Sequence, residues 1–123
     1  MTIDRLKFGK RGEKAAESYL KKQGYRILKK NYRTRVGEID IIAEHNNVLV
    51  FIEVKSRTDA TLEHPFMAVT PRKQKKIAQT ASCFLVQNKV GDREIRFDVV
   101  SVLPDNENSD SLQVEVLQDA FRL

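Results

Sequence analysis

The spacing of apolar residues changes several times along this chain, and each change predicts a new secondary-structure element. From Leu6 to Gln23 apolar residues recur three and four positions apart, which favours a helix that ends before Gly24. Three short apolar runs follow, and they predict strands over Tyr25 to Asn31, Ile39 to Ala43 and Val48 to Val54.

The second half of the chain predicts a long loop, a helix and two further strands. Arg57 to Val69 is expected to be a loop lying over the substrate. Thr70-Pro71 is a strong helix start, and that helix should run to about Asn88. Strands are expected over Glu94 to Leu103 and Leu112 to Leu117. The order α-β-β-β-α-β-β predicts an α/β fold, with a mixed five-stranded sheet and flanking helices.

The second and third expected strands form a hairpin that carries charged residues where apolar ones would be usual. Asn46-Asn47 between them favours a tight turn. A hairpin symmetric about this pair sets Asp40 opposite Glu53 and Glu38 opposite Lys55. Opposed residues share one face of a sheet, so this register gathers three carboxylates and one ammonium group.

Such a cluster needs compensating positive charge, because opposed like charges destabilise a sheet. Lys55 supplies part of it, and Mg²⁺ or Mn²⁺ would supply the rest, bound by Asp40, Glu53 and the main-chain carbonyl of Val54. Lys55 could also orient a water or neutralise charge on a phosphate. The alternative is a solvated hairpin face with one Glu–Lys ion pair, which contributes little.

Glu13 is a further candidate acid, on the first helix. It shares a helical face with the apolar residues Ala16 and Leu20, where an unpaired carboxylate is costly. In one interpretation, the Glu13 carboxylate points toward Asp40 and Glu53 of the hairpin. The other is a Glu near the helix start that is stabilised by the helix dipole or paired with Lys10 or Lys14.

Length and composition favour one domain over residues 1–123 and a cytoplasmic protein. The single cysteine, Cys83, excludes an internal disulfide and fits a reducing compartment. There is no apolar run long enough to cross a membrane and no apolar signal-peptide stretch. His45 and His64 are isolated, are expected on turns, and are assigned no metal.

The charge is unevenly distributed, which predicts a polyanionic partner. Residues 1–35 carry 12 Lys and Arg against 3 acids, whereas residues 36–71 carry 2 against 6. Basic segments attract nucleic acid through counterion release, whereas the acidic centre alone would repel it. A metal ion bound in the acidic centre would remove that repulsion. Exposed lysines that only solvate helices are the alternative. The residues expected to bind nucleic acid are Lys10, Arg11, Arg33, Arg35, Arg57, Arg72, Lys73 and Lys76.

Taken together, these residues resemble a known family. A helical Glu, then Asp, then Glu-x-Lys on a hairpin is similar to the PD-(D/E)XK nuclease superfamily. The closest resemblance is to the YraN-like family of small bacterial proteins, and the archaeal Holliday junction resolvases are similar in fold. The resemblance is carried by Gly12-Glu13 with Ala16, Tyr19-Leu20, Gly24-Tyr25, Asn31, Gly37-Glu38-Ile39-Asp40, Phe51-Ile52-Glu53-Val54-Lys55-Ser56-Arg57, Lys73, Arg96-Phe97-Asp98 and Ala120-Phe121.

This resemblance implies a restriction-endonuclease-like fold and a shared set of site residues. Asp40 and Glu53 would bind Mg²⁺ or Mn²⁺, Lys55 would assist catalysis, and Glu13 would complete the acidic site. The similarity to resolvases also implies a homodimer and branched or structured DNA as substrate.

Three functions follow as hypotheses. The first is a metal-dependent endonuclease that hydrolyses DNA phosphodiester bonds. The second is a non-catalytic nucleic-acid-binding module that keeps a nuclease-like fold. The third is a protein-interaction domain whose acidic C-terminal segment, Leu112 to Leu123, contacts a basic partner.

Overall fold

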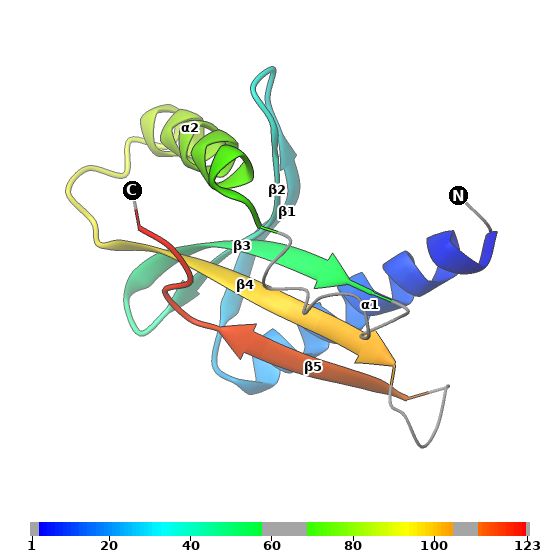
Figure 1. The fold of residues 1–123 in the computed structure, drawn as a ribbon. Coiled ribbons are helices and arrows are strands. Elements are labelled where there is room, and N and C mark those ends of the chain that lie inside the picture. Colours follow the sequence, from blue (N-terminus) through cyan, green and yellow to red (C-terminus); the bar gives the residue numbers. More distant parts are fainter. Residues whose placement is uncertain (1–2, 58–68, 105–110, 123) are drawn as a thin grey trace.

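The fold is a mixed α/β arrangement in the expected order (Figure 1). A computed structural model describes residues 3–57, 69–104 and 111–122. The loop expected over Arg57 to Val69 lies mostly outside these residues and stays a prediction. The elements are α1 (Ile3–Lys22), β1 (Arg26–Arg33), β2 (Glu38–His45), β3 (Val48–Ser56), α2 (Pro71–Gln87), β4 (Ile95–Pro104) and β5 (Leu112–Leu117).

The five strands form one sheet in the order β1-β2-β3-β4-β5. β3 and β4 are parallel, and α2 lies between them in the chain. The other neighbouring strands are antiparallel. The sheet is therefore mixed, as predicted, and β3 is its central strand.

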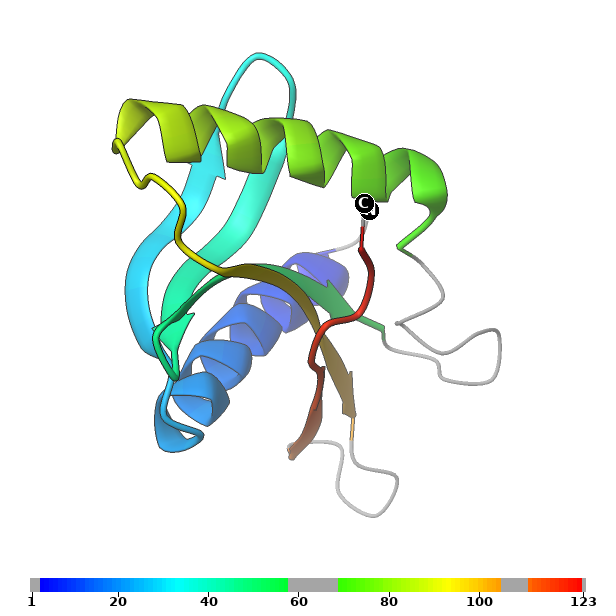
Figure 2. The same ribbon diagram turned by 90° about the vertical axis from the view of Figure 1, so that its left-hand side faces the viewer.

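The two helices cover opposite faces of this sheet (Figures 1 and 2). Ala16 and Leu20 of α1 pack in one cluster with Val50 and Ile52 of β3. On the other face, Phe84 of α2 packs in a second cluster with residues that include Leu49 and Phe51 of β3. Alternate β3 residues thus enter the two cores, as the period of two along a strand requires.

β1 is longer than the sequence predicts. The first strand is predicted to end at Asn31, but β1 continues to Arg33, because Tyr32 is buried and pairs with Ile39 of β2. Thr34 N donates a hydrogen bond to the carbonyl of Gly37 at 2.8 Å and closes a shorter turn. Extension of β1 brings Arg33 opposite Glu38.

A buried polar network ties the hairpin end of the sheet together. The Asp98 side chain accepts hydrogen bonds from Tyr25 Oη at 2.7 Å, from Arg96, and from the Asp119 amide. His45 stacks on Tyr25 with ring centroids 4.0 Å apart, and its Nδ1 lies 3.0 Å from Arg96. The expectation that His45 is isolated on a turn is wrong. His45 is the last residue of β2, and its ring packs on Tyr25, which directly precedes β1.

Gly12 allows α1 to lie against the end of β3. A Cβ at this position would clash with Ser56 Oγ and would lie 3.3 Å from Ser56 Cβ. The neighbouring residue, Glu13, faces the candidate site described below. Close contact of α1 with β3 therefore helps to position Glu13.

Gly12→Ala should destabilise the protein by about 1 kcal/mol, because overpacking against Ser56 outweighs the helix propensity gained with alanine. Urea unfolding followed by circular dichroism measures this change. In a Ser56→Ala background the clash with Oγ is absent, so Gly12→Ala should cost less. Equal costs in the two backgrounds would contradict the proposed contact.

Candidate metal and nucleic-acid site

The β2–β3 hairpin has the register that its sequence predicts. Pairs run symmetrically from His45–Val48 to Ile41–Ile52, and Asn46 and Asn47 both have positive φ, as a tight hairpin turn requires. Asp40 and Glu53 are the next residues beyond the last of these pairs.

Asp40 crosses the gap where the two strands part. Its Oδ2 accepts a hydrogen bond from the main-chain N–H of Val54 at 2.7 Å. This bond uses one carboxylate oxygen of Asp40 and holds the side chain against β3. Asp40 and the Glu53–Val54 segment therefore meet in space, as the hairpin register predicts.

Burial raises the pKa of both carboxyl groups. For Asp40 burial is the largest cause and the negative charge of Glu53 the next, whereas the Val54 hydrogen bond lowers the pKa; the result is about 7. For Glu53 burial again raises the pKa, and Lys55 opposes it. Lys55 Nζ lies 3.2 Å from Glu53 Oε1, with side chains only 19% and 17% exposed. Lys55 thus compensates Glu53 directly, and the charge of Lys73 also lowers the pKa of Glu53.

Glu13 and Glu38, the other two predicted acids, lie at the edge of this pair. Both raise the pKa of Asp40 by their charge. Glu13 lines a cavity with Asp40 between α1, β1 and β2. Glu38 was expected opposite Lys55, but it pairs with Arg33 of β1, with Nε to Oε1 at 3.3 Å. The reason is that β2 and β3 part beyond Ile41 and Ile52, whereas β1 extends far enough to bring Arg33 opposite Glu38.

The first turn of α2 brings a second lysine to the site. Contact with the Lys55 side chain is the main cause that lowers the pKa of Lys73, and the charge of Glu53 raises it. Thr70 caps this helix, because its Oγ1 accepts a hydrogen bond from Lys73 N at 3.3 Å. Sequence reasoning placed Lys73 at the helix start among the nucleic-acid-binding residues but missed its contact with Lys55.

The other predicted cations occupy several places around the acids. Lys10 and Arg11 line the cavity that contains Glu13 and Asp40. Arg57 follows β3, and its N–H bonds to the carbonyl of Val102 at 3.1 Å. Arg33 and Arg35 are exposed at the end of β1 and in the turn after it, and Arg72 and Lys76 are exposed on α2. Their role in nucleic-acid binding stays a prediction.

The donor set fits a hard divalent cation with few protein ligands. Asp40 has one oxygen left after its bond to Val54, and Glu53 supplies a second carboxylate. Within the described residues, no cluster of three or more His, Cys, Asp or Glu side chains has the arrangement of a metal site. Two carboxylates and a main-chain carbonyl match Mg²⁺ and Mn²⁺, which keep several waters, better than they match zinc.

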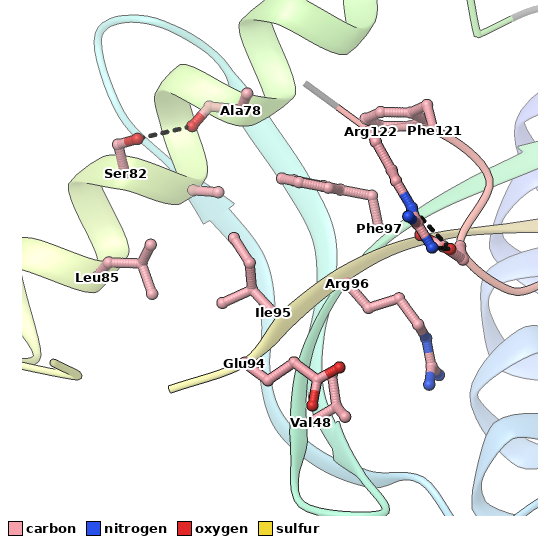
Figure 3. A pocket seen from close by; sticks show the side chains of 12 residues that line it. Val48, Ala78, Ser82, Leu85, Glu94, Ile95, Arg96, Phe97, Phe121 and Arg122 are labelled. Carbon is pink, nitrogen blue, oxygen red and sulfur yellow. Dashed lines mark hydrogen bonds and ion pairs between the residues drawn. The ribbon is translucent and has the colours of Figure 1, made fainter. Parts of the chain in front are cut away.

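A different cavity of about 540 Å³ lies away from these acids, between α2, β4 and the segment after β5 (Figure 3). Its lining includes Leu85 of α2, Ile95 of β4 and Phe121, which stacks on Phe97 at 5.0 Å between ring centroids. The ion pair of Arg122 with Asp119 lies at its rim. This pocket contains none of the predicted site residues.

Among the described residues, no helix has the length and apolar character needed to cross a membrane.

Comparison with known proteins finds one family over most of the chain. The model of the uncharacterised protein family UPF0102 matches residues 12–102. A UPF0102 protein of Clostridium acetobutylicum is 43% identical over 117 residues, covering 95% of each chain. A UPF0102 protein of Prosthecochloris aestuarii is 45% identical over 116 residues, covering 92% of this chain and 91% of its own. One of Syntrophus aciditrophicus is 42% identical, covering 96% and 91%.

The raised pKa of Asp40 predicts how stability depends on pH in a chelating buffer. An acid with a raised pKa binds its proton more tightly when folded, so stability falls as pH rises from 3.8 towards 7. Asp40→Asn removes this charge and should stabilise the protein above pH 7 by about 1–3 kcal/mol. The gain should vanish near pH 4.

Urea unfolding at several pH values measures this difference. Glu94→Gln, at an exposed acid remote from the site, is the matched control and should show no such trend. An Asp40→Asn protein whose advantage is the same at every pH would contradict the desolvated carboxylate pair.

Proposed function

This chain belongs to the uncharacterised family UPF0102, the YraN family, and from that premise we propose that it is a metal-dependent endonuclease acting on DNA. Asp40 and Glu53 hold Mg²⁺ or Mn²⁺ together with the Val54 main-chain carbonyl. Lys55 stabilises charge at the attacked phosphate, and Glu13 assists as a ligand or a base. Branched or structured DNA is the substrate that the resemblance to resolvases suggests.

One observation carries this proposal. Asp40 and Glu53 are largely buried, the charge of Glu53 raises the pKa of Asp40, and Lys55 forms an ion pair with Glu53. Buried like charges are expensive unless a cation compensates them. A divalent ion would remove this cost, whereas a purely structural role would favour apolar residues here.

The residues of the chain have defined tasks in phosphodiester hydrolysis. The oxygen of water joins phosphorus, one phosphorus–oxygen bond to the sugar breaks, and the leaving oxygen takes up a proton. A divalent ion supplies Lewis-acid chemistry, lowering the pKa of water and offsetting phosphate charge. Lys55, held by Glu53, directs its remaining protons at the phosphate, and Glu13 is placed to accept a proton beside Asp40.

A second candidate function is a nucleic-acid-binding module without catalysis. The observation in its favour is that the described residues offer two convergent carboxylates and no cluster of three metal-binding side chains. In this case the lysines and arginines bind phosphate, and the acids contribute no chemistry. DNA binding would then be strongly salt-dependent and indifferent to metal.

Asp40→Asn and Lys55→Ala should each reduce cleavage of plasmid or branched DNA by about 100-fold or more in Mg²⁺ or Mn²⁺. The control is Asp92→Asn, an exposed acid in the turn before β4, which should cleave as the wild type does. Gel analysis of the products measures the rates. Equal cleavage by all four proteins would indicate a contaminating nuclease and defeat the assignment.

Mn²⁺ should also stabilise the wild-type protein without any DNA. A ligand that binds only the folded state raises stability by about 2.7 kcal/mol at a concentration 100 times its Kd. Thermal unfolding should therefore shift upward with Mn²⁺, and Asp40→Asn should abolish the shift. A wild-type protein that binds DNA but shows no shift would favour the binding module.

A further inference from the structure

A small cavity with both basic and acidic side chains adjoins the candidate site on the α1 side. It has a volume of about 280 Å³ and lies between α1, strands β1 and β2, and Val54 of β3. Its basic lining residues are Lys10, Arg11, Lys14 and Lys30, and its acidic ones are Glu13, Glu17 and Asp40. The cavity is therefore continuous with the acid pair, although Glu53 and Lys55 do not line it.

Two of the cavity's three lysines have no carboxylate partner among the described residues. Lys10 and Lys14 lie one helical turn apart, both are exposed, and neither forms an ion pair within the described part of the chain. Like charges at this spacing repel each other. Lys30 differs, because it shares Glu17 with Lys21 at distances of 3.3 and 3.1 Å. The Lys10–Lys14 stripe is thus the part of the cavity that an anion would relieve.

A second basic group borders the acids on the α2 side. Lys55 pairs with Glu53, and Lys73 of α2 contacts Lys55. The acids therefore lie between two groups of cations that come from different helices and strands. A single phosphate can meet only one group, whereas a strand of regularly spaced phosphates can meet both at once.

From this arrangement we infer that the α1 cavity binds the phosphate next to the one that reacts, so that the substrate strand continues across the acid pair. This rests on the proposed function and deepens it: the bond that is cut is internal to a strand, and a terminal nucleotide alone is a poor substrate. Glu13 lines the same cavity, and its charge confines the phosphate to the Lys10–Lys14 stripe. The amide of Asn31 offers a neutral donor on the β1 side.

The test measures binding in a chelating buffer, so that neither metal nor cleavage is needed. Oligothymidylates of increasing length are titrated into the isotopically labelled full chain, and backbone amide shifts are recorded. Long strands should perturb amides on both sides, including Asn31 at the cavity and Lys73 on α2. Thymidine monophosphate should bind far more weakly and should not perturb both sides.

The Lys10→Ala/Lys14→Ala protein should lose the shift at Asn31 and keep the shift at Lys73. The slope of its binding constant against salt should fall by about 0.7 for each lysine removed. Lys22→Ala is the matched control, because Lys22 is exposed on the same helix and outside the cavity. Circular dichroism verifies that each variant is folded.

Two results would overturn the inference: an Asn31 amide that long strands leave unshifted, or a Lys22→Ala effect equal to that of the cavity pair. Failure of the proposed function has a different signature. If a protein shows both sets of amide shifts but never cleaves DNA, the inferred path of the strand across the acids stands and the proposed endonuclease activity is wrong.

Discussion

The packing of β3 between two helices is the constraint on which the rest of the structure depends. Leu49 and Phe51 point into the α2 core, and Val50 and Ile52 point into the α1 core. A strand covered on both faces must be apolar for as long as the cover lasts. The β2 ladder ends after Ile52, and the buried residues of β3 give way there to partly buried ones that begin with Glu53, although α1 still meets the end of β3 at Ser56. The candidate site is therefore located where β2 and β3 part.

The partial cover beyond Ile52 also sets the electrostatics of the site. Glu53 is close enough to Lys55 for an ion pair, whereas Asp40 accepts a hydrogen bond from the uncharged main-chain N–H of Val54. Burial is the largest influence on both carboxyl groups and raises the pKa of each. The compensation of the two carboxyl groups is thus unequal. On the α2 side the imbalance is reversed. Lys73 lies close to Lys55, so two ammonium groups there face the single carboxylate of Glu53.

Much of this arrangement could be predicted because it depends on short-range geometry. A two-residue Asn46-Asn47 turn fixes the hairpin register, and that register brings Asp40 to the Glu53–Val54 segment. Contacts set by long-range packing could not be predicted. Lys73 meets Lys55 because α2 returns across the sheet. Glu38 pairs with Arg33 because β2 parts from β3 while β1 extends beyond its predicted end. The stacking of His45 on Tyr25 likewise has no signal within either local sequence.

Two aspartates of the same sheet differ in how the fold compensates their charge. Asp98 is fully buried, and it accepts two hydrogen bonds from the Arg96 guanidinium as well as one each from Tyr25 and the Asp119 amide. A carboxylate that serves the fold can therefore be completely compensated in this protein. Among the described residues, Asp40 accepts the main-chain N–H of Val54, and the charges of three carboxylates act against it. The fold thus compensates Asp98 more fully than Asp40, and the proposed divalent cation would supply positive charge at Asp40.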